Sequence, residues 1–254
     1  MLFATTLLAI GEPESPRAEK AETPPFTVTE SEIQLPGITI DRKTLEVRIE
    51  ATVCLASGIL EYVVCRPDTF EHESIFTTTA KPELVHAALL LAGLKPTPLL
   101  PGLTELWWDK ALENRDSRVK IDVEWQDRTE KKRTSLASML RGRAIVENAP
   151  GDGKLADDSW VFAGSFMRPD PDGGARIYAG NISGILVGIW PDSSTVIQYG
   201  IASGNPYEGQ QHGLEIDEKR VPKLGTKVNL VLSRQFPKTA APAAEKDSPG
   251  GVER

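Results

Sequence analysis

The chain contains three histidines, His72, His86 and His212, and two of them lie near carboxylate residues in the first half of the sequence. Glu61 precedes these two histidines, and Glu73 directly follows His72. Two imidazoles and one carboxylate that leave a coordination position open are typical of catalytic zinc or iron(II) sites. One hypothesis is therefore a metal-dependent enzyme that binds zinc or iron through His72, His86 and Glu61 or Glu73.

The spacing of these residues also supports a structural role. The separation of His72 from His86 matches no standard metal motif, and on a strand His72 and Glu73 would point to opposite faces. His86 lies in a strongly apolar segment, where a histidine more often hydrogen-bonds a carboxylate or a backbone carbonyl. Glu61 is a candidate partner. We expect His86 to be structural, and the metal site remains the alternative.

Two adjacent tryptophans form a second kind of candidate site. Trp107 and Trp108 could line a groove for a sugar or another ligand, because exposed indoles stack on flat apolar faces. A core position for at least one of them is the competing interpretation. Other reaction classes lack their motifs: no glycine follows Ser165 as in a hydrolase nucleophile elbow. The glycines between residues 180 and 188 match neither a phosphate loop nor a dinucleotide fingerprint.

The composition predicts an ordinary globular protein. The 254 residues are 40% hydrophobic and 26% charged, and a chain of this length can bury its own core. The mean hydropathy of -0.25 argues against an integral membrane bundle. The net charge of -7 argues against a nucleic-acid partner. The one basic run, Lys131-Lys132-Arg133, is short and follows Glu130, so we expect a solvated surface there.

The two ends of the chain differ in composition from the middle. Residues 2–10 are apolar but too short to span a bilayer, and they suit the hydrophobic part of a secretory signal that lacks its basic region. We therefore expect a possible truncated signal segment and flexible leader over residues 1–25, and a periplasmic or secreted protein. Residues 237–254 are of low complexity and predict a disordered tail. Residues 26–236 are expected to form a single domain.

Two apolar runs predict strands near the start of this domain. Residues 45–53 alternate with period two, residues 59–65 form a second run, and Ser57-Gly58 between them predicts a hairpin. In that register Cys54 and Cys65 would be offset by roughly 13 Å along the strands. A disulfide requires Cα atoms within about 7 Å. We therefore expect two buried, free thiols.

One helix has matching start and stop residues. Pro82 and Glu83 stand in its first turn and Gly93 at its end. Because the segment is apolar nearly all round, we expect one long helix at about residues 82–93 that is buried on several sides. Further strands are expected at residues 38–41, 73–79, 118–125, 160–165, 176–180, 182–190 and 227–232. This pattern predicts an α+β fold in which β-structure dominates, with a mostly antiparallel sheet.

Two blocks of motifs resemble the YdjY-like domain. The first block consists of Leu60-Glu61, His72-Glu73-Ser74, Lys81-Pro82, residues 85–90 and residues 93–96, and the second of residues 160–165 and 178–184. The resemblance covers roughly residues 38–232. It implies an exported bacterial protein, frequent in planctomycete-type bacteria, from a family without an assigned biochemical role. Some relatives carry iron-sulfur-type cysteine motifs, but two cysteines cannot supply four thiolates.

We therefore expect an exported, non-enzymatic domain of the cell envelope that binds an unknown envelope protein or a small molecule. The first alternative is the metal-dependent enzyme with zinc or iron. The second is a scaffold or assembly subunit whose edge strands pair with other chains. No catalytic residue is assigned. The candidate ligand-binding residues are Glu61, His72, Glu73, His86, Trp107 and Trp108.

Overall fold

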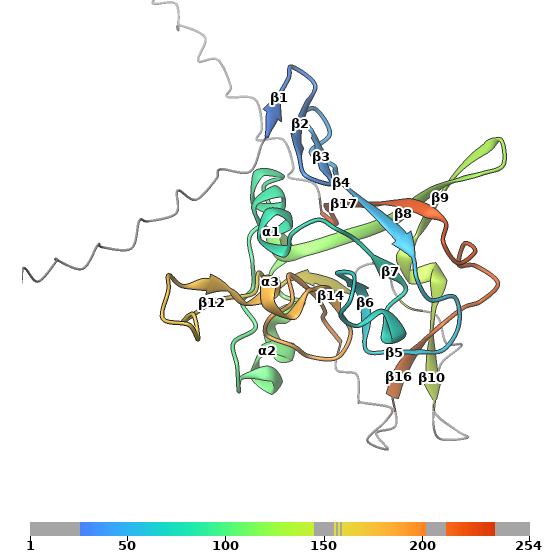
Figure 1. Ribbon diagram of the computed structural model, residues 1–254. Helices are drawn as coiled ribbons and strands as arrows, with labels where there is room; N and C mark the ends of the chain where they lie inside the picture. The colour runs from blue at the N-terminus through green and yellow to red at the C-terminus, as the bar shows by residue number, and fades with distance from the viewer. Residues whose placement is uncertain (1–25, 145–154, 156, 158, 202–211, 237–254) are drawn as a thin grey trace, which may run out of the picture.

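The computed structural model describes residues 26–144, 155, 157, 159–201 and 212–236 (Figure 1). The expected leader and tail lie outside these residues. The strands are β1 (Thr27–Val28), β2 (Glu32–Leu35), β3 (Ile38–Asp41), β4 (Val47–Val53), β5 (Ile59–Leu60), β6 (Tyr62–Cys65), β7 (Phe76–Thr77), β8 (Arg118–Asp127), β9 (Glu130–Ser135), β10 (Leu140–Ala144), β11 (Trp160–Phe162), β12 (Met167–Arg168), β13 (Ile177–Tyr178), β14 (Ile185–Gly188), β15 (Ile197–Tyr199), β16 (His212–Ile216) and β17 (Lys227–Arg234). The helices are α1 (Pro82–Leu91), α2 (Thr104–Ala111) and α3 (Ala179–Ser183), with short 3-10 turns η1 (Glu71–Glu73), η2 (Arg115–Ser117) and η3 (Leu136–Met139).

In this described part of the chain, 8 strands close into a barrel. Their order is β4-β17-β8-β11-β15-β14-β6-β7, and β7 pairs back onto β4. The pairs β14–β15 and β6–β7 are parallel, and the others are antiparallel. The predicted α+β fold is therefore wrong. Alternation in the sequence identified strands but not the pairing that closes them, because β4 meets β17 from the far end of the chain.

Alternation along the strands separates a buried inner face from a polar outer wall. On β4, Val47, Ile49, Ala51 and Val53 are buried, whereas the residues between them are half-buried or exposed. The β17 residues Lys227 and Asn229 are exposed in the same way. The barrel interior holds large side chains such as Trp160, Phe76 and Phe162, each of which stabilises the fold by roughly 1.5–3 kcal/mol when buried. The polar side chains of β4, β17 and β8 therefore share one outer surface.

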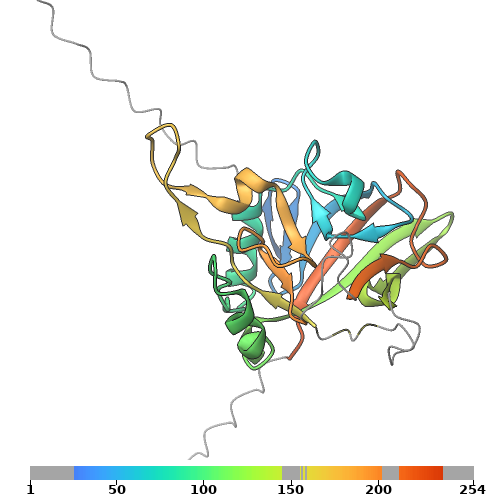
Figure 2. The same ribbon diagram turned by 90° about the horizontal axis from the view of Figure 1, so that it is seen from below.

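Helix α1 begins at Pro82 as predicted but is not the expected long buried helix. It ends at Leu91, and Gly93 after it has a positive φ of 82°. Leu90 and Leu91 are 47% and 56% exposed, because only one side of the helix packs on β3, β14 and α3. All three α-helices lie on one side of the barrel, opposite the β8–β9 hairpin (Figure 1 and Figure 2). No helix among the described residues is long and apolar enough to cross a bilayer.

The predicted hairpin around Ser57-Gly58 is also wrong. Strand β7 lies between β4 and β6, while β5 pairs with β16. The two cysteines are free, as expected. Cys65 is fully buried, whereas Cys54 is half-buried and its thiol lies 3.1 Å from the Ser74 carbonyl oxygen. Burial raises the pKa of the Cys54 thiol to about 12.

Candidate functional site

Of the predicted site residues, Glu61 directly precedes Tyr62 and Glu73 lies close enough to affect its pKa, whereas His72 pairs with Glu73. His72 Nε2 lies 3.2 Å from Glu73 Oε1, and the His72 side chain is 72% exposed. The Glu61 carbonyl accepts hydrogen bonds from the backbone N–H groups of Ile189 and the residue after it. Burial, followed by the negative charges of Asp192, Glu61 and Glu73, raises the pKa of Tyr62. A ligand role for these residues stays a prediction.

His86 has a different set of partners. Its Nδ1 lies 2.7 Å from the Gly164 carbonyl oxygen and 2.9 Å from the Tyr178 hydroxyl. The carbonyl can only accept, so Nδ1 carries the proton and donates it there. The Tyr178 hydroxyl also donates to this carbonyl, at 2.9 Å. The expectation that His86 hydrogen-bonds a carboxylate or carbonyl is therefore met by Gly164 rather than by Glu61.

The surroundings of His86 are those of a packed structural residue. Its ring meets the Phe162 ring edge-on, with centroids 5.0 Å apart. Burial lowers the pKa of His86, so the imidazole is neutral at pH 7. Gly164 has a φ of +83°, and an added Cβ would lie 2.8 Å from Pro96 Cβ and 3.3 Å from His86 Cε1. We call His86, Gly164 and Tyr178 the His86 cluster; it joins α1 to the segment after β11 and to β13.

The predicted metal site is not assembled. Among the residues that the structure describes, no group of three or more His, Cys, Asp or Glu side chains could hold a metal ion. His72 contacts Glu73, whereas His86 contacts a backbone carbonyl and a phenol. These histidines therefore do not combine with Glu61 into the ligand set that their residue types suggested.

The two predicted tryptophans do not form a pair of exposed rings. Trp107 is only 5% exposed, and its indole N–H donates to the Thr97 carbonyl oxygen at 2.8 Å. Trp108 is half-buried and packs against the small apolar cluster that contains Leu99 and Val161. The core interpretation therefore holds for Trp107.

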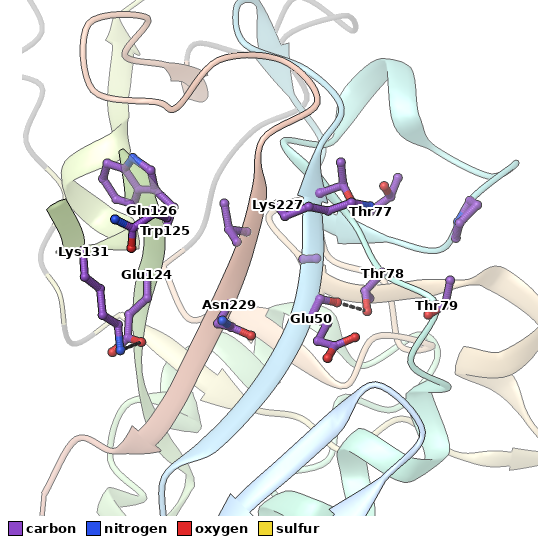
Figure 3. Close-up of a pocket in the computed structure, with 14 residues that line it drawn as sticks. Glu50, Thr77, Thr78, Thr79, Glu124, Trp125, Gln126, Lys131, Lys227 and Asn229 are labelled. Atoms are coloured by element: carbon purple, nitrogen blue, oxygen red, sulfur yellow. Dashed lines mark hydrogen bonds and ion pairs between the residues drawn. The ribbon is translucent and has the colours of Figure 1, made fainter. Parts of the chain in front are cut away.

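A cleft of about 630 Å³ lies on the outer wall of the barrel (Figure 3). It is formed where β7, β4, β17 and β8 run side by side. Its polar lining includes Glu50, Thr78, Glu124, Lys131, Lys227 and Asn229. Cavities of this size accommodate small molecules.

Strand register places the polar side chains of the cleft in rows. Asn229 on β17 pairs with Glu50 on β4 and with Glu124 on β8. Lys227, which lies two residues before Asn229 on β17, pairs with Thr52 on β4. Because residues two apart on a strand face the same side, Asn229 and Lys227 present neighbouring polar groups on one wall.

Glu124 is the best-buried charge in this cleft. It is 3% exposed, although it lies on the outer wall. Its carboxylate oxygens lie 2.6 Å from Arg48 Nη1, 2.9 Å from Lys131 Nζ and 3.1 Å from Arg133 Nη1. Burial alone would raise its pKa, but Lys131 and Arg48 outweigh that effect and hold the pKa below its ordinary value. Glu124 is therefore ionised at neutral pH and fully engaged.

Three other side chains in the cleft are available to a ligand. Among the residues that the structure describes, Lys227 Nζ contacts only the Thr52 hydroxyl, at 2.9 Å. In the described part of the chain, the Glu50 carboxylate and the Asn229 amide have neither a hydrogen-bond partner nor an ion-pair partner. All three side chains belong to exposed residues. The cleft thus offers a free carboxylate, a weakly engaged ammonium and a free amide.

A comparison with protein families shows to which family the chain belongs. The family model described as the YdjY domain matches residues 38–233. The chain belongs to the YdjY domain family. This confirms the resemblance seen in the sequence. No curated protein and no solved structure matches the chain.

The fold of this YdjY domain brings the two motif blocks into contact. His86 from the first block meets Gly164 and Tyr178 from the second, at sequence separations of 78 and 92 residues. The motifs that carried the resemblance therefore meet at the His86 cluster, a packing junction. They contribute no residue to the polar lining of the cleft.

Sequence reasoning missed the cleft of the YdjY domain. The relevant pattern was present in residues 118–125, where Lys120, Asp122 and Glu124 alternate with apolar residues. Such alternation shows that the charges share a face. It does not show that β4 and β17 place Glu50 and Asn229 beside them.

Proposed function

We propose that this YdjY domain is a non-catalytic binding domain that holds a small polar ligand in the outer-wall cleft. The observation that carries the proposal is the combination of a cavity of about 630 Å³ with unengaged polar groups in its lining. Glu50, Asn229 and Lys227 together supply acceptors and donors to one bound molecule. A small molecule suits this cleft better than a large protein surface, because ligand sites are concave with a few convergent polar groups.

The charge arrangement in the cleft supports binding rather than acid-base catalysis. A general acid or base works best with a pKa near the operating pH. Glu124 is instead held ionised by Lys131 and Arg48, which lower its pKa. Its role is to fix the positions of the basic side chains around it.

We further propose that the domain acts in the cell envelope, as a periplasmic or secreted protein. The apolar stretch at residues 2–10 supports export, because its length suits the hydrophobic part of a secretory signal. The ligand is then a molecule present outside the cytoplasm.

A fragment screen by two-dimensional NMR tests the binding proposal. We expect polar fragments to shift backbone resonances of Glu50, Thr52 and Asn229 in the full chain. Asn229→Trp fills the cleft from an exposed position and should abolish these shifts. Lys219→Trp, on an exposed turn outside the cleft, is the matched control and should preserve them. Shifts that survive Asn229→Trp, or that map elsewhere, would show that the cleft is not the binding site.

A further inference from the structure

The charges that remain free in the cleft restrict the chemistry of its ligand. Glu124 and Lys131 form an ion pair at 2.9 Å (Figure 3), and Arg48 and Arg133 also contact this carboxylate. Glu50 and Lys227 are the other charged residues among those that line the cleft. Within the described residues, the Glu50 carboxylate has no basic partner, and the Lys227 ammonium contacts a single group, the Thr52 hydroxyl. A ligand with both a positive and a negative group complements this pair.

The positions of these two residues set the distance between the ligand charges. Glu50 pairs with Asn229, and Lys227 is two residues away from Asn229 on the same strand. Such diagonal neighbours lie roughly 7–8 Å apart, with their Cβ atoms somewhat closer. An extended peptide spans about 3.3–3.6 Å per residue. Two residues span roughly 7 Å, so a dipeptide separates its free amino terminus from its free carboxyl terminus by a matching length.

Asn229 fits the middle of such a ligand. Its amide supplies both donors and an acceptor, and it has no other partner among the described residues. It stands directly across from Glu50 on the neighbouring strand. A peptide group contains one N–H and one C=O, so a single amide side chain satisfies both.

We propose that the ligand is a dipeptide with free termini. Its ammonium group binds Glu50, its carboxylate binds Lys227, and its peptide group binds Asn229. This inference rests on the proposed function of the cleft and adds the chemical class of the ligand.

The test uses three probes: alanylalanine with free termini, its N-acetyl derivative and its C-terminal amide. Dissociation constants for the full chain are measured by NMR titration. An exposed ion pair contributes about 0.2–1 kcal/mol, so each cap should weaken binding by about 1.4- to fivefold. Glu50→Gln should remove the effect of acetylation only, and Lys227→Met should remove the effect of amidation only.

Control variants and distinct outcomes separate the test of the peptide ligand from the test of the cleft as a binding site. Glu218→Gln and Lys219→Met change exposed charges outside the cleft, so both caps should keep their full effect there. Circular dichroism checks that every variant is folded. If free and capped peptides bind equally in the cleft, the zwitterion inference is overturned and the binding site stands. If neither dipeptides nor fragments shift cleft resonances, both proposals are overturned.

Discussion

Replacing Glu124 with glutamine tests whether the outer wall of the barrel depends on a buried negative charge. Glutamine keeps the shape of the side chain and one acceptor oxygen, but it removes the charge. Arg48, Lys131 and Arg133, whose side chains are 31%, 67% and 37% exposed, then lose their shared anion. Glu50→Gln is the matched control, because Glu50 is in the same row of the sheet and has no basic partner in the described residues.

The expected loss follows from the exposure of these partners. A hydrogen bond to a charged group contributes roughly 1.5–3 kcal/mol, and Glu124 receives three. Solvent screens the partners, and exposed pairs contribute only about 0.2–1 kcal/mol each. We therefore expect Glu124→Gln to lower the free energy of unfolding by about 2 kcal/mol, or the melting temperature by about 4–8 °C. Glu50→Gln should stay within about 0.5 kcal/mol of the wild type.

The pH dependence supplies an independent check on Glu124. Its pKa in the folded state lies below the ordinary value of 4.5. The ionised carboxylate therefore contributes stability above pH 4.5, and this contribution is lost as the pH falls through the folded pKa. In urea unfolding, the difference in free energy of unfolding between the wild type and Glu124→Gln should be present at pH 7 and shrink toward pH 3. Equal losses for Glu124→Gln and Glu50→Gln, or a gap that persists in acid, would refute the reasoning.

Three further predictions concern the His86 cluster and the thiols. His86→Ala should cost about 1–3 kcal/mol in urea unfolding, because a hydrogen bond and ring packing are lost. Since the folded pKa of His86 is lowered, the contribution of this side chain to stability should be present above pH 6.5 and decline below it. An unchanged urea midpoint for His86→Ala would contradict the structural role. Gly164→Ala should cost more than about 2 kcal/mol, while Gly173→Ala, with the same positive φ but open space around it, should cost about 1 kcal/mol. Alkylation followed by mass spectrometry at pH 8 should label Cys54 slowly and Cys65 only in urea, because burial raises the Cys54 pKa to about 12; rapid native labelling would argue against this environment.

Local features of the fold could be predicted from the sequence, but the pairing of the strands could not. Alternation over residues 45–53 correctly predicted a strand, on which Ile49 and Val53 are buried, and Pro82 correctly marked the start of α1. The hairpin failed because the Cys54 N–H bonds to the Ile75 carbonyl oxygen, so β7 occupies the position that β6 was expected to take. Alternation fixes which face of a strand is buried, but it does not select the neighbour of that strand.

The same limit applies to the candidate site. The type of partner for His86 could be predicted from its apolar segment, since a half-buried imidazole requires a hydrogen-bond partner. The identity of that partner, Gly164, could not, because it is 78 residues away. The cleft brings together residues that are even farther apart in the sequence: Lys227 contacts Thr52 across 175 residues. Only the closed order of strands brings such residues together.

The edges of the sheet bear on the alternative of a scaffold subunit. In the described part of the chain, β4, β17 and β8 each pair with other strands on both sides, so they are not edge strands that another chain could extend. Strand β9 pairs only with β8 among the described strands, and it carries Lys131, Lys132 and Arg133. Charged residues on an edge strand, lysine especially, disfavour strand addition. Here they also pair with carboxylates on β8. The outer wall is therefore better suited to hold a small ligand beside β9 than to extend the sheet through it.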